Sequence, residues 1–289
     1  VSRIGGFTRL RDTILFGDCR KTIPTITEPV KMCVTSPPYY GLRDYGGEEN
    51  QIGMEESPEK YVEQLVNVFR SVREVLTDDG TLWLNIGDSY YNYRSDGNYP
   101  KQTVSKTNQD LPSFSPVRGN KLEGYKSKDL IGIPWLLAFA LRKDGWYLRQ
   151  DIIWNKPNPM PESVRDRCTK SHEYIFLFSK SKNYYFDVDS IKESTIDGKG
   201  LKRKKSVWTV NTKPYKGAHF ATFPPELIEP CIKAGSQKGD IILDPFIGSG
   251  TTGMVSKSLG RHYIGCELHQ SYNDLIQNRV SQYTINLED

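Results

Sequence analysis

Two short motifs carry residue types that could do chemistry, and they stand at opposite ends of the chain. Residues 35–39 are Thr-Ser-Pro-Pro-Tyr, and residues 244–252 are Asp-Pro-Phe-Ile-Gly-Ser-Gly-Thr-Thr. Successive prolines make a rigid turn, which can aim hydroxyl and carbonyl oxygens at the amino group of a flat base. The glycines of the second motif let the backbone approach a ligand closely. Together the motifs predict transfer of a small group from a nucleoside cofactor to a base.

The first motif suits the activation of an exocyclic amino group. Such a nitrogen is a poor nucleophile because its lone pair is delocalised into the ring. Hydrogen bonds from its two N–H groups to the Ser36 hydroxyl and the Pro37 carbonyl would draw it toward a pyramidal form. Tyr39 offers a ring on which a base can stack. We therefore predict that Ser36, Pro37, Pro38 and Tyr39 form the catalytic turn.

The second motif suits a nucleoside cofactor. Asp244 follows the buried-type strand 240–243, at the end where ligands bind in open α/β sheets. Its carboxylate would attract the ammonium group of S-adenosylmethionine. Thr251 and Thr252 could cap the next helix and hydrogen-bond a ligand carboxylate. Glu267, just after the following strand, could bind both hydroxyls of a ribose.

A different class of enzyme shares part of this pattern. Residues 248–253 match G-x-G-x-x-G, and an acid follows the next strand. That is also the dinucleotide fingerprint, so an NAD-dependent oxidoreductase is the distant alternative. Asp244 argues against it, because a carboxylate beside the loop would repel a pyrophosphate.

Alternating apolar patterns predict the elements that position these motifs. Expected strands cover 12–19, 30–35, 81–86, 146–154, 173–179, 240–243 and 262–266. Expected helices run from 57 to the glycine at 80, over 129–144 and 224–234, from about 251, and over about 270–283. The alternation predicts one α/β domain over 1–289 with a mainly parallel sheet and helices on both faces. A polar loop at 91–128 and an irregular segment at 195–216 interrupt it.

Composition narrows the class of protein. The chain has 289 residues, a net charge of +4 and no apolar run long enough for a membrane span, which predicts a soluble, cytoplasmic protein without a signal peptide. The five cysteines are widely spaced and lack a C-x-x-C pair. We expect buried thiols in a reducing compartment and no metal site.

The sequences of the motifs and their order along the chain resemble those of the β group of amino-methylating DNA methyltransferases, and the resemblance covers residues 12 to about 283. Further resemblances lie at 17–18, 153–156, 171–173 and 219–224. The resemblance implies a Rossmann-like, S-adenosylmethionine-dependent methyltransferase fold with a mostly parallel, seven-stranded sheet. It also implies a circularly permuted order, with the catalytic half first.

The resemblance and the motifs together predict a set of cofactor-binding residues. They are Asp18, Cys19, Thr35, His219, Phe220, Thr222, Phe223, Asp244, Pro245, Phe246, Gly248, Ser249, Gly250, Thr251, Thr252 and Glu267. Trp154, Lys156 and His172 either line the target pocket or brace the sheet.

The serine at position 36 bears on which base is methylated. In the family, (S/T)-P-P-(Y/F) usually accompanies N4-cytosine methylation, and (D/N)-P-P-(Y/F/W) accompanies N6-adenine methylation. We therefore expect N4-cytosine methylation, with N6-adenine as the alternative and RNA or protein amide methylation behind it. Cytosine C5 chemistry fits poorly because Cys231 lies in a helical stretch, where we expect a core residue.

The amino group is hidden in a duplex, so the resemblance implies base flipping in site-specific double-stranded DNA. The recognition segment is expected at 187–216, with 91–128 sharing the task. Basic side chains there should contact phosphates. The predicted DNA-binding residues are Arg43, Arg118, Lys199, Lys202, Arg203, Lys204 and Lys205. The setting expected is a prokaryotic or phage restriction-modification system, with a cognate endonuclease and a homodimer as further expectations.

Overall fold

The structure is a computed structural model that describes residues 10–41, 51–91, 122–213 and 223–281, and the backbone of two short strands near the N-terminus. The strands are β1 (Arg3–Ile4), β2 (Phe7–Thr8), β3 (Thr13–Phe16), β4 (Val30–Thr35), β5 (Leu76–Ile86), β6 (Tyr147–Asn155), β7 (His172–Ser179), β8 (Glu193–Ser194), β9 (Leu201–Lys202), β10 (Val207–Thr209), β11 (Ile241–Asp244) and β12 (His262–Glu267). The helices are α1 (Cys19–Thr22), α2 (Pro58–Val75), α3 (Ile133–Lys143), α4 (Pro225–Gly235), α5 (Thr251–Ser258) and α6 (Asn273–Ser281).

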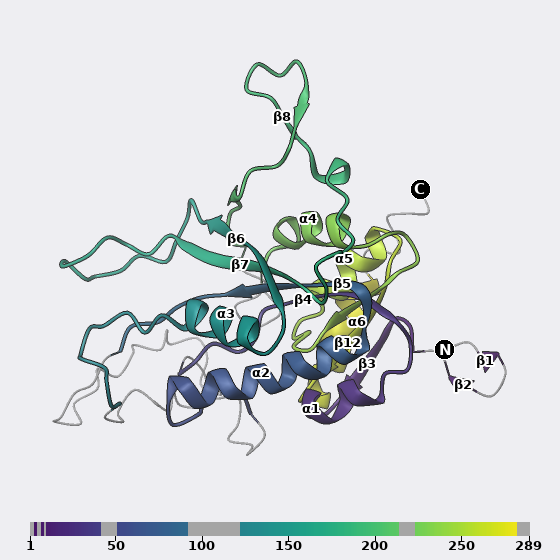
Figure 1. Ribbon diagram of the computed structural model, residues 1–289, viewed down its shortest axis with the longest axis horizontal. Coiled ribbons are helices and arrows are strands. Elements are labelled where there is room, and N and C mark those ends of the chain that lie inside the picture. The colour runs from purple at the N-terminus through teal and green to yellow at the C-terminus, as the bar shows by residue number, and fades with distance from the viewer. Residues whose placement is uncertain are drawn as a thin grey trace.

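Eight strands form one sheet in the order β10-β6-β7-β5-β4-β11-β12-β3 (Figure 1). Only β7 runs antiparallel to its neighbours within this sheet. The carboxyl ends of the seven parallel strands therefore share an edge with the amino end of β7. Loops that leave this edge are placed to build a common site.

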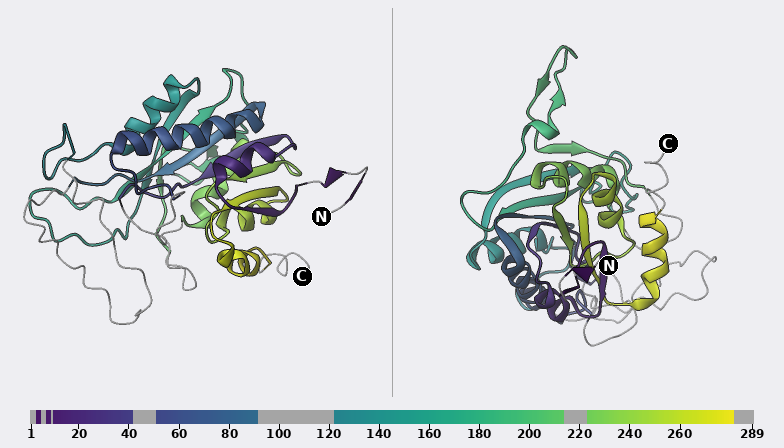
Figure 2. Two further views of the ribbon diagram at one scale, coloured as in Figure 1. Left: turned by 90° about the horizontal axis from the view of Figure 1, so that it is seen from below. Right: turned by 90° about the vertical axis from the view of Figure 1, so that its right-hand side faces the viewer.

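Helices cover both faces of the sheet, as Figure 2 shows. Alternation along each strand sends side chains to opposite faces. Cys33 packs in the cluster beneath α1, α2 and α3, whereas its neighbours Met32 and Val34 pack beneath α4 and α5. Ile276 of α6 packs in a third cluster with Tyr263 of β12. The mixed α/β fold with a mostly parallel sheet is thus confirmed.

The sheet has eight strands, where seven were expected. The extra strand is β10, which pairs in parallel with β6 inside the segment predicted to be irregular. Trp208 explains it, because this side chain is 4% exposed and packs in the core while Val207 and Thr209 beside it are exposed. A strand of three residues with a single buried side chain is too short for its hydrophobic periodicity to be detected.

Several element boundaries also differ from the prediction. Helix α2 ends at Val75, and residues 76–80 belong to β5, although Gly80 was expected to close the helix. The register between β4 and β5 shifts here, so the early part of β5 is an irregular strand. Strand β9 lies within the segment 195–216, and β8 directly precedes that segment. The two strands pair as a hairpin that projects from the body of the molecule (Figure 1).

Candidate active site at the carboxyl edge of the sheet

The two motifs meet on neighbouring strands. Strand β4 ends at Thr35 and β11 ends at Asp244, and these strands pair in parallel at the centre of the sheet. The Thr35 Oγ1 donates a hydrogen bond of 2.6 Å to the Asp244 Oδ1, across 209 residues of sequence. The turn after β4 and the glycine loop after β11 therefore lie side by side.

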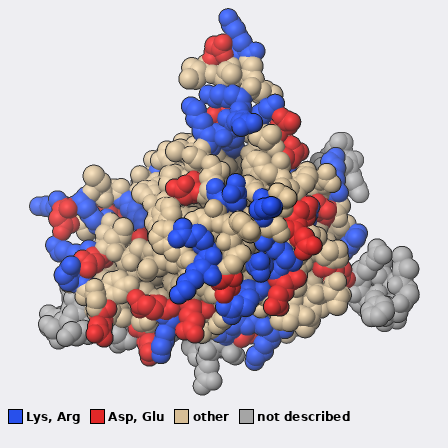
Figure 3. Space-filling model, viewed as in Figure 1, with Lys and Arg blue, Asp and Glu red and all other residues tan. Residues whose placement is uncertain are grey.

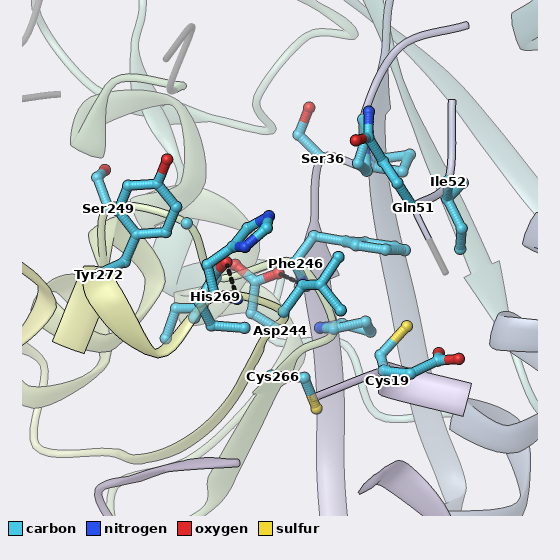
Figure 4. A pocket seen from close by; sticks show the side chains of 18 of the residues that line it. Cys19, Ser36, Gln51, Ile52, Asp244, Phe246, Ser249, Cys266, His269 and Tyr272 are labelled. Atoms are coloured by element: carbon cyan, nitrogen blue, oxygen red, sulfur yellow. Dashed lines mark hydrogen bonds between the residues drawn. The ribbon is translucent and has the colours of Figure 1, made fainter. Parts of the chain in front are cut away.

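A pocket opens between these two loops (Figure 4). In the close-up, Ser36 and Gln51 lie on one side of the opening, and Ser249, His269 and Tyr272 lie on the other. The predicted residues that line it are Asp18, Cys19, Ser36, Pro37, Pro38, Tyr39, Phe223, Asp244, Pro245, Phe246, Gly248, Ser249, Thr251 and Glu267. The catalytic turn and the predicted cofactor residues thus share one cavity.

Asp244 is a buried carboxylate that organises the glycine loop. It is 1% exposed and accepts hydrogen bonds from Thr35, from Thr252 Oγ1 at 2.6 Å and from the Phe246 amide at 3.0 Å. Burial raises its pKa to about 6, although these hydrogen bonds oppose the shift. The negative charge sits in the pocket wall, where it favours a cationic ligand group.

Glu267 supplies a second acid at the end of the neighbouring strand β12. It accepts a hydrogen bond of 3.0 Å from the His269 amide. Burial raises the pKa of Glu267 to about 7. Hydrogen bonds from the amides of His269 and Gly248 favour the ionised form and oppose this shift. Two acids with raised pKa values in one cavity are typical of a functional site.

Asp18 lines the pocket, but its carboxylate is engaged elsewhere. It caps α1 through the Arg20 amide at 2.9 Å and binds the Arg20 guanidinium through both oxygens. Burial would raise the pKa of Asp18, but Arg20 outweighs burial and lowers it. The carboxylate therefore stabilises the turn, and Gly17, whose φ is +118°, lets the backbone bend there.

Three predicted cofactor residues stand behind the pocket wall. Thr35 and Thr252 hold Asp244, and Gly250 packs against Ile276 of α6 with a φ of +85°. In contrast, Thr251 reaches the cavity, and its buried hydroxyl has no hydrogen-bond partner among the described residues. This hydroxyl fits the polar group of a bound ligand, as a cofactor carboxylate would supply.

The catalytic turn is held by side chains from other elements. Tyr61 of α2 donates a hydrogen bond of 2.7 Å to the Pro38 carbonyl. Tyr39 donates one of 2.7 Å to Glu173 Oε2, at the start of β7. Burial, then the Glu173 charge, holds the pKa of Tyr39 well above its usual value, so the hydroxyl keeps its proton. The turn is therefore fixed on both sides of its second proline.

Some predicted residues lie outside the described part of the chain, namely Arg43, Arg118, His219, Phe220 and Thr222. Gly17, beside Asp18, and Ile247, inside the glycine motif, also line the pocket. The lining residues that were not predicted are Gln51, Ile52, Cys266, Leu268, His269 and Tyr272. His269 and Tyr272 follow β12 within five residues of Glu267, so their position after a strand end could have signalled them. Gln51 and Ile52 carry no such signal.

Five of the basic residues predicted to bind DNA lie on the β8–β9 hairpin or directly after it, namely Lys199, Lys202, Arg203, Lys204 and Lys205. Figure 3 shows Lys and Arg side chains gathered on this projecting part of the molecule. Lys199, Arg203 and Lys205 are exposed. Lys202 pairs with Glu193 across the hairpin at 3.8 Å, and Lys204 lies over the Trp208 ring at 5.1 Å. Three of these cations, Lys199, Arg203 and Lys205, are thus exposed on the hairpin or at its base.

The cysteines follow the prediction with one exception. Cys19, Cys33, Cys231 and Cys266 are buried, but Cys168 is exposed in the loop between β6 and β7, where burial was expected. Cys231 is fully buried in α4 and its thiol donates to the Leu227 carbonyl, so it is a core residue. Among the described residues, no helix is long and apolar enough to span a membrane.

An open sheet whose central strands end in a glycine loop and a rigid proline turn is the architecture of a methyltransferase. The PvuII DNA methyltransferase (cytosine-N4-specific) has the same fold, with a TM-score of 0.66 at 18% identity over 96% of this chain and 91% of that one. The Thermus thermophilus protein TTHA0409, solved with S-adenosyl-L-methionine, aligns with a TM-score of 0.62 at 23% identity over 93% of both chains.

Sequence comparison narrows this class to a family. A family model for DNA methylases of the N6/N4 type matches residues 30–278. Type II methyltransferase M.Cfr9I of Citrobacter freundii is 51% identical over 93% of this chain and 87% of its own. M.SmaI of Serratia marcescens is 52% identical over 92% and 90%. The chain belongs to the N6/N4 DNA methylase family, and S-adenosylmethionine is its cofactor.

Proposed function

We propose that this DNA methyltransferase methylates the exocyclic N4 of cytosine in a specific duplex sequence. The observation that carries the proposal is the placement of Ser36 in the wall of the same cavity as Glu267 and the glycine loop. Ser36 supports cytosine because a serine at this position usually accompanies N4 methylation in the family. The PvuII enzyme, which shares the fold, is described as cytosine-N4-specific.

The residues of the pocket fit the cofactor. Asp244 would attract the ammonium group, the Thr251 hydroxyl would bind the carboxylate, and Glu267 would accept hydrogen bonds from the ribose. When bound, S-adenosylmethionine supplies an electrophilic methyl group on a sulfonium that is its own leaving group. The protein then has to bring the base nitrogen into line with that methyl group and exclude water.

The catalytic turn would hold the flipped base. The Pro38 carbonyl already accepts a hydrogen bond from Tyr61, so the Pro37 carbonyl is the acceptor that we propose for the amino group. The Ser36 hydroxyl is the second acceptor. Hydrogen bonds to both N–H groups would localise the lone pair on the nitrogen and aim it at the methyl group that the bound cofactor would supply.

Mass spectrometry of nucleosides tests the base. DNA treated with the protein and isotopically labelled S-adenosylmethionine should yield labelled N4-methylcytosine. Labelled N6-methyladenine would keep the family and refute the assignment from Ser36. The absence of label in DNAs of varied sequence, with cofactor binding demonstrated, would move the substrate toward RNA or protein.

We also propose that the β8–β9 hairpin contacts DNA phosphates through Lys199, Arg203 and Lys205. Each phosphate contact contributes a slope of about −0.9 to the plot of log affinity against log salt. Replacing all three by Gln should reduce the slope by about 2 to 3, whereas Lys238→Gln with Lys257→Gln, away from this hairpin, should not change it. An unchanged slope in the triple variant would refute the contact.

The remaining proposals concern biological setting. Close relatives are named Type II methyltransferases. This supports a role in protecting host DNA from a cognate restriction endonuclease. DNA from cells that express the chain can be digested with a panel of restriction endonucleases. Resistance to one enzyme would identify the protected sequence, and cleavage by every enzyme tested would refute the role. A homodimer is the further expectation, checked by sedimentation of the protein alone.

A further inference from the structure

A buried arginine lies behind the glycine loop and was not predicted to take part in the site. Arg279 belongs to α6 and is 6% exposed. Ile276, Arg279 and Val280 follow one another at helical spacing and are the buried residues of α6, so they share one face of this helix. The position is costly for a guanidinium, because a charge withdrawn from water must be compensated by hydrogen bonds or by an opposite charge.

Helix α6 approaches the glycine loop closely enough for Arg279 to reach it. A Cβ atom at Gly250 would lie 3.0 Å from Ile276 Cγ2, so the bare glycine lets the loop and the helix meet. Arg279 Nη1 donates a hydrogen bond to Ser249 Oγ, and both side chains are buried. The guanidinium of α6 therefore acts directly on a residue of the loop.

The hydrogen bond from Arg279 fixes the direction of the Ser249 hydroxyl. A guanidinium has donors and no acceptor, so Ser249 Oγ can only accept from it. The O–H bond of Ser249 must then point away from Arg279. Because Ser249 lies in the wall of the pocket (Figure 4), an acceptor bound in the pocket can receive this proton.

A second hydroxyl of the loop suits the same kind of acceptor. Thr251 is 3% exposed and lines the pocket, and its Oγ1 has no hydrogen-bond partner among the described residues. It is the first residue of α5, and Gly250 before it has no side chain to cap the first amides of the helix. A buried hydroxyl without a partner, at the positive end of a helix, favours a ligand with anionic oxygens.

The wall of the pocket carries acids without a compensating basic residue. Asp18, Asp244 and Glu267 line it, and none of its described lining residues is a lysine or an arginine. These carboxylates would repel an anionic group of a ligand. Arg279 supplies a positive charge from behind the loop, on the side of Ser249. The arrangement thus favours a ligand with a cationic group near Asp244 and an anionic group near Ser249.

We propose that Arg279 is a positioning residue for the carboxylate of S-adenosylmethionine. It directs the Ser249 hydroxyl toward that carboxylate and supplies positive charge behind the loop. Thr251 is the second hydroxyl donor, and the ammonium group is left to Asp244. This inference rests on the proposed placement of the carboxylate at Thr251, and it does not depend on which base is methylated.

Calorimetric titration of the whole protein, without DNA, compares S-adenosylmethionine with its decarboxylated analogue. Arg279→Gln should weaken binding of S-adenosylmethionine by about tenfold, because a charge-assisted contact is lost, and should change binding of the analogue by less than about twofold. Ser249→Ala should show the same selectivity. The loss in the double variant should be smaller than the product of the two single losses, because both changes break one hydrogen bond. Arg279→Lys keeps a charge and a donor and should recover most of the affinity.

The matched control is Arg261→Gln, just before β12, which removes another partly buried arginine that hydrogen-bonds a serine, from its Nη2 to the Ser236 carbonyl at 2.8 Å. It should leave both affinities unchanged. Equal losses for the two ligands in Arg279→Gln would show that the residue only stabilises the fold and would overturn the proposal. Unchanged binding of S-adenosylmethionine by Ser249→Ala would also overturn it, and this variant decides the matter if Arg279→Gln does not fold. Equal affinity of the wild type for the two ligands would refute the placement of the carboxylate itself.

Discussion

Glu267 should give cofactor binding a pH dependence that one substitution removes. Burial raises the pKa of this carboxyl to about 7 in the ligand-free protein. Two ribose hydroxyls would donate hydrogen bonds to the Glu267 carboxyl. The ionised carboxylate can accept both, whereas the protonated acid must also donate its own proton and so accepts them less well. An acid that loses its proton on binding makes affinity rise with pH up to its pKa in the free protein.

The magnitude follows from the two acids of the pocket. At about pH 6, roughly one Glu267 in eleven is ionised, so the Kd for S-adenosylmethionine should be about tenfold higher than at about pH 8. Asp244, with a pKa raised to about 6, adds a factor of about two. Glu267→Gln preserves the shape of the side chain but cannot titrate. Its Kd should therefore vary only about twofold between these pH values.

Isothermal titration calorimetry between about pH 5.5 and pH 8 measures the effect, with Glu229→Gln, an acid paired with Lys233 on α4, as the matched control. Equal pH dependence in wild type and Glu267→Gln would refute the reasoning.

The same raised pKa of Glu267 has the opposite consequence for the stability of the ligand-free protein. The folded state binds the proton more tightly, so the free energy of unfolding should fall as pH rises from about 4.5 to about 7.

Three further substitutions test the framework of the site. Thr35→Val removes a buried hydrogen bond to Asp244, and calorimetric unfolding should show a loss of about 1–3 kcal/mol together with weaker cofactor binding. Gly265→Ala would place a Cβ atom 2.9 Å from Ile247 Cβ, beneath the glycine loop, so the affinity for the cofactor should drop. The circular dichroism spectrum should stay unchanged, because the pairing of the strands is not altered. Cys231→Ala should retain DNA methylation and lose about 1 kcal/mol of stability in urea unfolding, because its thiol lies in the core and does not line the pocket. A loss of methylation with the fold intact would contradict this role.

The parts of the site that follow strand ends could be predicted from the sequence. Residues 30–35 and 240–243 are short, mostly apolar runs that lead into distinctive turns, and both strands lie where they were expected, to within one residue. Local chemistry is sufficient there, because glycine and proline restrict the turn and the strand restricts where the turn lies.

Glu173 and Asp18 show what local patterns leave out. Glu173 meets Tyr39 of the catalytic turn only because β7 runs antiparallel between β6 and β5, and sequence periodicity does not give strand order. Asp18 lines the pocket, and its carboxylate also binds Arg20, two residues away, a contact that the pattern of the sequence did not indicate. Strand β10 escaped detection because its one buried side chain, Trp208, stands among charged residues.

The pairing of β4 with β11 has a consequence for how the protein is made. The chain emerges from the ribosome from its N-terminus, so the serine turn is synthesised long before the strand that must lie beside it. Until residue 244 has emerged, Thr35 has no Asp244 to bind, and the central seam of the sheet is open. Closing such a distant pairing is a slow, late event in folding. A nascent chain that ends before residue 244 therefore lacks one wall of the cofactor pocket, which can form only after β11 has been synthesised.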